Sequence, residues 1–409
     1  MHDARHLTRH GRAAALLPVN LPTDSPMTTA PELDLPPRPA AVPDWKRPAW
    51  WLQMGIGGLL GGGITLGMIL GLDDFSGLDA LMVAAALLVA GWLQVLVHEA
   101  GHAAAGTAVG LRPFAMGVGP LRAERGAQGW RVHWARNIRG IGGFAVLLPR
   151  GGEQRPRQTA VYLLGGPLAN LLAAGLAWLA LRAGHADTMP WSAVAWATVG
   201  TGLALGLVNL LPFLAGGWSS DGRQLLKLWQ GKDEARVMSL LTRLGGLAMV
   251  GVRPRDWPPA LASDFQLDGA PQAVGDALAR CRLVQAIDAR RFDDPGAAAA
   301  AARLAAGYWH GPDGIRQFNA LLLARWLLDT TGDHARAAAW CAQAEGSIVD
   351  QGASRAALQA RIALLRGERD EARRQLALAE QLAPRVPDPA GQAMLAESLD
   401  ELRGQLAAA

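Results

Sequence analysis

Three side chains suited to metal binding and acid–base chemistry, His98, Glu99 and His102, lie in the segment LVHEAGHAAAG at the end of a long apolar run. On a helix, residues four apart lie on one face, so both imidazoles can bind a single metal ion. Glu99 lies at the edge of that face, where its carboxylate can reach a metal-bound water without being a ligand. Zinc lowers the pKa of such a water to about 7, and a carboxylate can take its proton as the hydroxide attacks a carbonyl. The spacing therefore predicts zinc-dependent hydrolysis with Glu99 as the general base.

A catalytic zinc ion needs a third protein ligand and one open position. Glu124 follows at the distance typical of one class of zinc proteases, but the flanking Arg122 and Arg125 favour a solvated ion pair. Asp221, in the segment NLLPFLAGGWSSDGRQLL, follows the last apolar run and is expected to begin a helix. An Asp at that position can also be the helix N-cap. Spacing alone leaves Asp221 open between a metal ligand and a cap.

Four uncharged apolar runs must position these residues, and each is long enough to cross a bilayer of about 30 Å. They cover residues 49–72, 80–97, 159–181 and 190–214. Buried helices of a soluble protein are the alternative, but four such runs are hard to place in one soluble core. Ionisable groups at membrane depth are costly and are functional by default, which argues against a chance HExxH.

The charges of the connecting segments predict an orientation for these runs. Lys46 and Arg47 precede the first run, and nine Arg against two Glu lie between Arg112 and Gln158. By the positive-inside rule, the N-terminus, this Arg-rich segment and the C-terminal tail are cytosolic. The sequence thus predicts a multi-pass protein of the inner (cytoplasmic) membrane, embedded in the lipid bilayer, with His98, His102 and Asp221 on one side.

Composition agrees with a membrane protein that carries soluble parts. Of the 409 residues, 50% are hydrophobic and only 18% are charged, which is too apolar for an ordinary soluble enzyme. The net charge of +4 does not indicate nucleic-acid binding. The two cysteines, Cys281 and Cys341, lie far apart and form neither a disulfide framework nor a CxxC metal motif.

The predicted fold class is mainly α, with about four transmembrane helices, a membrane-associated β-hairpin and a soluble helical C-terminal domain. We expect four regions: a disordered cytosolic leader at 1–48, a transmembrane domain at 49–230, a linker with a short helix at 231–263, and a helical domain at 264–409. In the last region, GDHARAAAWCAQAE and GERDEARRQLALAE repeat after 35 residues, with alanines at equivalent positions. This period is typical of tetratricopeptide repeats, and an unrelated Ala-rich bundle is the alternative.

The segment WRVHWARNIRGIGGFAVLLP at 130–149 alternates apolar and polar residues before it reaches Gly142 and Gly143. Such a pattern predicts strands and a turn. Because unpaired backbone cannot face lipid, a strand that dips into the membrane must line a cavity of the protein.

Four elements in this order resemble the site-2 protease family of intramembrane zinc metalloproteases: HEAGH at 98–102, IRGIGGF at 138–144, GGPLAN at 165–170 and NLLP…SDG at 209–222. The resemblance covers about residues 75–230. It implies zinc ligation by His98, His102 and Asp221, with Glu99 as the base. It also implies that the segment containing Gly142 and Gly143 is a hairpin whose edge strand binds the unwound substrate.

This sequence departs from the family pattern in two ways. The residues FLAGGWSS lengthen the gap between Asn209 and Asp221. The chain also lacks an evident PDZ insert, and the helical tail takes the place of the regulatory domains found in many relatives.

Two asparagines in the matching motifs, Asn170 and Asn209, have two possible roles. Each can donate to the substrate carbonyl or its oxyanion. Each can equally form a hydrogen bond between helices, and the sequence does not decide between these roles.

The residues therefore predict an endopeptidase that cleaves transmembrane protein substrates, with a C-terminal domain that binds a regulatory protein. An inactive membrane scaffold is the main alternative, although a purely structural metal site has no use for Glu99. A transporter would show inverted repeats between its halves, and the sequence shows none.

Overall fold

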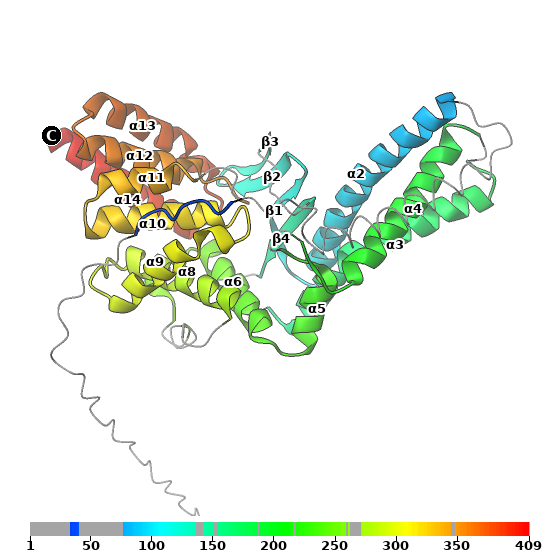
Figure 1. Ribbon diagram of the computed structural model, residues 1–409, viewed down its shortest axis with the longest axis horizontal. Helices are drawn as coiled ribbons and strands as arrows, with labels where there is room; N and C mark the ends of the chain where they lie inside the picture. The colour runs from blue at the N-terminus through cyan, green and yellow to red at the C-terminus, as the bar shows by residue number, and fades with distance from the viewer. Residues whose placement is uncertain are drawn as a thin grey trace, which may run out of the picture. The chain divides into compact units, whose positions relative to one another are not determined.

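The computed structural model describes residues 33–40, 77–135, 142–149, 154–186, 188–215, 218–258, 261, 271–344 and 348–408. Over these residues the protein is mainly helical, with one small antiparallel sheet (Figure 1). The mainly α class predicted from the sequence is confirmed.

Three helices are long and apolar enough to cross a membrane: α2 (Gly77–Ala108), α3 (Pro156–Arg182) and α4 (Trp191–Leu210). They correspond to the second, third and fourth predicted runs. Helix α2 extends past Val97 to Ala108, so the HEAGH segment lies inside it rather than at its end. Helix α4 ends at Leu210, four residues before the predicted end. The first predicted run, 49–72, lies outside the described residues.

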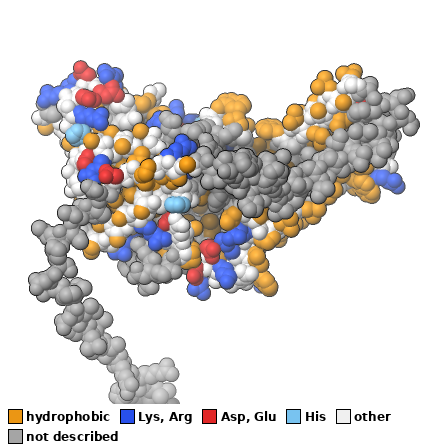
Figure 2. Space-filling view, viewed as in Figure 1, with side chains coloured by type: hydrophobic (Ala, Val, Ile, Leu, Met, Phe, Trp, Pro, Cys, Tyr) orange, Lys and Arg blue, Asp and Glu red, His pale blue; other side chains and the backbone are white. Residues whose placement is uncertain are grey.

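The three helices pack against one another in pairs (Figure 1). Helices α2 and α3 lie close together at two glycines, since a Cβ built on Gly101 would lie 2.4 Å from the carbonyl oxygen of Gly165. Large apolar side chains such as Leu88, Leu172 and Leu207 point outward and are exposed. Figure 2 shows hydrophobic side chains where this part of the surface is drawn in colour.

A four-stranded antiparallel sheet follows α2, in the order β3-β2-β1-β4. Its strands are β1 (Arg112–Val118), β2 (Leu121–Gly126), β3 (Gly129–Trp134) and β4 (Gly143–Leu148). The two strands of the predicted hairpin therefore lie at opposite edges of a larger sheet. The alternating pattern located them correctly, but their partners β1 and β2 come from residues for which no strand was predicted.

A short two-stranded ladder, β5 (Leu214–Ala215) and β6 (Trp218–Ser219), links α4 to α5 (Asp221–Trp229). Helix α6 (Asp233–Met249) follows, and its Leu240 and Leu244 pack against Trp257 and Leu278. The predicted linker at 231–263 is thus largely a 17-residue helix joined to the C-terminal domain.

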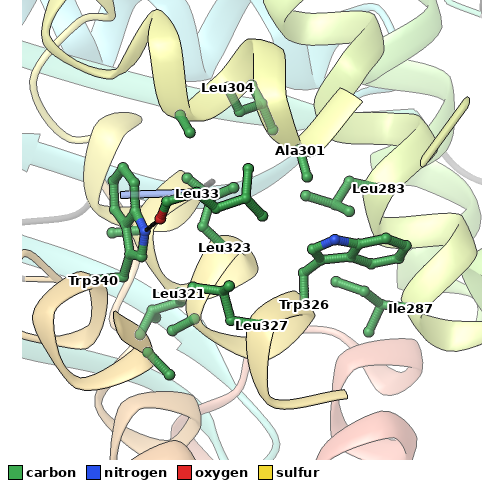
Figure 3. Packing of buried hydrophobic residues seen from close by; sticks show 14 of the residues in the cluster. Leu33, Leu283, Ile287, Ala301, Leu304, Leu321, Leu323, Trp326, Leu327 and Trp340 are labelled. Carbon is green, nitrogen blue, oxygen red and sulfur yellow. Dashed lines mark hydrogen bonds between the residues drawn. The ribbon is translucent and has the colours of Figure 1, made fainter. Parts of the chain in front are cut away.

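The C-terminal domain is built of paired helices. They are α8 (Gln272–Asp288), α9 (Pro295–Ala306), α10 (Arg316–Thr330), α11 (His334–Cys341), α12 (Gly352–Leu365), α13 (Arg369–Leu382) and α14 (Pro389–Ala408), with single 3-10 turns η2 (Pro254–Asp256), η3 (Tyr308–His310) and η4 (Ala383–Arg385). Figure 3 shows its main core, in which Trp326 and Trp340 are almost completely buried.

The 35-residue repeat corresponds to equivalent positions in this domain. Ala337 on α11 and Ala372 on α13 are both fully buried. The turns before these helices contain Gly332 and Gly367, both with positive φ, a conformation that glycine adopts without steric cost. The helices are paired as the repeat predicts, and the tetratricopeptide class stays a prediction.

One part of the predicted leader is ordered against the C-terminal domain. Residues 33–40 form no helix or strand, yet Leu33 is only 4% exposed and lies in the core shown in Figure 3. A leucine in an isolated Pro-rich stretch carries no local sign of such a distant contact, and the disordered leader at 1–48 stays a prediction. The rest of 1–48 lies outside the described residues.

Candidate metal centre

The three side chains predicted as zinc ligands come together although they are distant in sequence. Nε2 of His98 lies 3.1 Å from Nε2 of His102 and 3.1 Å from Oδ2 of Asp221. Nε2 of His102 lies 3.4 Å from the same carboxylate oxygen. All three residues are buried. Two turns of α2 and the first residue of α5 therefore form one compact group of metal-ligand atoms.

Ser220, not Asp221, caps helix α5. The Ser220 hydroxyl accepts a hydrogen bond from the backbone N–H of Arg223 at 3.2 Å, which satisfies one of the free donors of the first turn. The Asp221 carboxylate is therefore available to the two histidines. Gly222 allows this position, since a Cβ there would lie 1.9 Å from the carbonyl oxygen of Leu210.

A buried relay of amides orients the His98 imidazole. The side-chain amide of Asn170 donates to the backbone carbonyl and to the side-chain carbonyl of Gln94, at 2.7 and 2.6 Å. Its own oxygen must then face Nδ1 of His98, 2.6 Å away. Because this oxygen only accepts, the hydrogen-bond network assigns the His98 proton to Nδ1, and Nε2 keeps its lone pair.

His102 is oriented in the same manner by main chain. Its Nδ1 lies 2.7 Å from the backbone carbonyl of Tyr162, which can only accept, so Nδ1 carries the proton. The lone pairs of both Nε2 atoms and the Asp221 carboxylate then converge without a hydrogen between them. Such a cluster of acceptors needs a positive charge at its centre.

Zinc fits this donor set. Two imidazole nitrogens and one carboxylate oxygen are three of its common ligands, and ligands about 2.0–2.1 Å from a tetrahedral ion lie about 3.3 Å apart. The observed separations of 3.1–3.4 Å match that spacing. Three protein ligands leave a fourth position for water or substrate, as in catalytic rather than structural sites. Hydrogen bonds to the outer ring nitrogens are the usual support of such ligands.

Glu99 lies beside this group and against the start of β4. Its side chain is 5% exposed. A Cβ built on Gly143 would lie 2.7 Å from Oε1 of Glu99, so only glycine allows the carboxylate to approach the strand this closely. Glu99 and the first residue of an edge strand therefore lie within contact of each other.

Gly166 has a comparable role on the other side of the site. A Cβ at this position would lie 2.5 Å from Nε2 of His102, the atom that faces the metal position. Helix α3 can pass the imidazole only because this residue has no side chain. The GGPLAN motif thus supplies both the space beside His102 and, through Asn170, the support of His98.

The residues predicted to bind substrate lie in different surroundings. Asn170 is fully buried and its amide is bonded to protein groups, as described above. Asn209 lies half-buried in the last turn of α4. Gly142 is exposed next to β4, with its carbonyl oxygen accepting from the N–H of Gly119 at 2.8 Å. The substrate-binding roles of these residues stay predictions.

Glu124 does not join the metal-ligand group. It lies on β2, directly opposite Arg131 on β3, and is only 3% exposed. The predicted ion pair is present, but it is buried, and it includes Arg131 on the neighbouring strand at 3.5 Å. Arg122 lies over the Phe144 ring.

A second cluster of potential ligands is formed by Glu124, His133 and Asp350. Here an arginine already lies among the carboxylates, since Arg131 is 2.8 Å from Asp350 and 3.5 Å from Glu124. Burial raises the pKa of Glu124 and lowers that of His133, which disfavours the charged form of both groups. This cluster is an ion-pair contact between the sheet and the loop before α12.

The sequence interpretation missed two residues of the centre, Gln94 and Tyr162. Gln94 could have been found, because it is a polar residue in an apolar run, four positions before His98 and therefore on the same helix face. Tyr162 contributes a backbone carbonyl, which any residue provides, so no sequence signal identifies it.

Comparisons with protein-family models, with curated proteins and with solved structures found no match to this chain. The function must therefore be argued from the residues themselves.

Proposed function

We propose that this protein is an intramembrane zinc endopeptidase that hydrolyses peptide bonds of membrane-spanning substrates. The observation that carries the proposal is the convergence of two Nε2 lone pairs and one carboxylate oxygen, all buried, with Glu99 beside them. A structural metal site would be closed and would have no use for a carboxylate base.

When bound, zinc supplies a Lewis acid that lowers the pKa of a coordinated water to about 7. His98, His102 and Asp221 would hold the ion. Glu99 would take the proton from the attacking water and pass it to the leaving amine. Asn170, with Gln94 behind it, and the Tyr162 carbonyl would keep both imidazoles in the tautomer that presents Nε2 to the ion.

The free edge of β4 supports an extended substrate. Strand β4 ends the sheet order β3-β2-β1-β4, so one of its edges has no partner within that sheet. A substrate segment that adds to this edge would form backbone hydrogen bonds next to Gly143, and Glu99 touches that residue. A transmembrane helix must unwind to bind in this way, which places cleavage at a locally extended segment.

The environment of the centre supports a membrane substrate. His98 and His102 lie in the last third of α2, a helix long and apolar enough to cross a bilayer. The Arg-rich segment after α2 favours a cytosolic position for this end of the helix. We infer a location in the inner membrane, with both termini cytosolic and the metal near the cytosolic boundary.

The test has two steps. Purified protein in detergent should contain one zinc ion per chain by elemental mass spectrometry. A tagged Glu99→Gln variant, crosslinked in native membranes, should retain single-span proteins that the wild type cleaves in proteoliposomes. Wild-type protein without metal after zinc supplementation, or equal cleavage by both forms, would refute the proposal.

A further inference from the structure

The extended segment 33–40, LDLPPRPA, lies against the C-terminal domain in the manner of a bound peptide. It has no helix or strand of its own, and the helices that it contacts lie about 270 to 300 residues later in the chain. We infer that the C-terminal domain contains a peptide-binding site, and that residues 33–40 occupy it as a detachable intramolecular ligand.

Two tryptophans recognise the backbone of this segment. The indole N–H of Trp340 donates to the carbonyl of Leu33 at 2.8 Å (Figure 3), and that of Trp309 donates to the carbonyl of Pro36 at 2.7 Å. Trp340 is fully buried, so its N–H requires an acceptor. Two indole donors thus hold by its carbonyls a segment that forms no helix or strand of its own.

The backbone of the segment matches a site that offers hydrogen-bond donors. Pro36, Pro37 and Pro39 have no N–H, so much of its backbone presents only carbonyl groups. Proline also biases the preceding residue toward an extended conformation, which lowers the entropy lost on binding. A Pro-rich segment that docks on aromatic side chains is a recurrent mode of peptide recognition.

Side chains of the segment provide an anchor and a charge pattern. Leu33 is 4% exposed and packs in the main core of the domain, whereas Leu35 is half-buried against it. Asp34 lies 3.8 Å from Arg336, and the Arg38 guanidinium lies 5.5 Å from the centre of the Trp309 ring. The site therefore binds a peptide with a buried leucine, an acidic residue beside an arginine of the domain, and a Pro-Pro-Arg sequence whose arginine lies over a tryptophan ring.

The test uses the full chain in detergent and a fluorescent peptide with the sequence of residues 33–40. In the wild type the tethered segment competes as an intramolecular ligand and should exclude the added peptide. The variant Leu33→Asp places a charge in an apolar pocket and should release the segment. This variant should bind the peptide at least about ten-fold more tightly than the wild type does.

Matched tryptophan variants locate the binding site. In the Leu33→Asp background, Trp309→Phe removes one donor and should weaken peptide binding roughly five-fold. Trp326→Phe is the control, since Trp326 is buried in the same core but lies away from Leu33 (Figure 3). Equal effects of the two changes would contradict recognition by Trp309.

The fold is monitored through Cys281 and Cys341, which are free and buried. Both thiols should stay unreactive toward maleimide in Leu33→Asp and in the milder variant Leu35→Asp. If the thiols of both variants become reactive, the segment is an integral part of the core and the inference is wrong. It is equally wrong if both variants stay folded and bind no peptide.

Discussion

Two clusters of histidine and carboxylate in this protein look alike in composition but differ in what surrounds them. One contains His98, His102 and Asp221, and the other contains Glu124, His133 and Asp350. In the first, amide and backbone acceptors hold each imidazole proton on Nδ1, so the ligand atoms face an uncompensated centre. In the second, the Arg131 guanidinium lies within 3.5 Å of Glu124 and 2.8 Å of Asp350, so the two carboxylates already share a cation.

The difference shows that the support around a cluster, not its ligand count, decides between a metal centre and an ion-pair contact. In a metal centre, hydrogen-bond acceptors hold the outer N–H groups of the histidine ligands, and no side-chain cation lies among the ligand atoms. An ion-pair contact already contains its cation. Four predictions test this comparison, ordered by the size of the expected effect.

The largest effect is expected for the base of the first cluster. Glu99→Gln should lower the rate of substrate cleavage about 10²- to 10⁴-fold, because the amide cannot accept the proton of the attacking water. The zinc content, measured by elemental mass spectrometry, should stay at the wild-type value. Glu124→Gln is the matched control and should cleave at the normal rate. If the Glu99→Gln protein cleaved substrate at the wild-type rate, Glu99 would not be the general base.

The next effect concerns the third ligand. Asp221→Asn should weaken zinc binding by more than the about 10- to 100-fold typical of residues outside the ligand shell. Competition with a zinc-binding dye measures this affinity. Glu124→Gln should bind zinc as the wild type does. If Glu124→Gln bound zinc more weakly than Asp221→Asn, the second cluster would be the zinc site.

A smaller loss is expected from the support of His98. Asn170→Leu removes the acceptor for Nδ1 and should weaken zinc binding about 10- to 100-fold. The control is Thr242→Val on α6, where the hydroxyl donates to the carbonyl of Met238 on the same helix. Unchanged affinity in Asn170→Leu, with lower cleavage, would instead favour the substrate-binding role.

The smallest effect belongs to the second cluster. Arg131→Ala leaves the buried Glu124 and the half-buried Asp350 without their shared cation, and should lower the free energy of unfolding by about 1–3 kcal/mol. Thermal unfolding monitored by circular dichroism measures the change. Zinc content should be unaffected. Loss of zinc in this variant would mean that the two clusters are not independent.

The effect of Arg131→Ala should depend on pH in a defined direction. Burial raises the pKa of Glu124 above its usual 4.5, so this group loses its charge first as the pH falls. For Asp350, burial is outweighed by the Gly352 N–H and Arg131, which lower its pKa below the usual 3.8. Asp350 stabilises the fold at neutral pH, and this contribution is lost as the pH falls through its folded pKa. The difference between variant and wild type should therefore begin to shrink above pH 4.5, where Glu124 gains its proton, and should shrink further below pH 3.8, where Asp350 does.

Several features of the fold could be predicted from short stretches of sequence. The three described helices that are long and apolar enough to cross a membrane follow from runs of apolar residues, and strands β3 and β4 follow from alternation. The partners of β3 and β4 in the sheet, β2 and β1, could not be predicted in this way. A strand's pattern indicates which face is buried but not which strand lies beside it. Strand β1 shows no such alternation, and in β2 the buried residues are the polar ones, Arg122 and Glu124, so the apolar pattern does not reveal the strand.

The sequence by itself determined that His98 and His102 share one helix face, because 3.6 residues per turn bring positions four apart into line. Only the tertiary structure decided that Asp221 joins them, that Glu124 does not, and that Leu33 enters the core of a domain 300 residues away. The physical reason is the range of the interactions. Helix periodicity depends on a few neighbouring residues, so it can be predicted from their spacing. The long-range contacts depend on how whole helices and strands pack, which no local spacing shows.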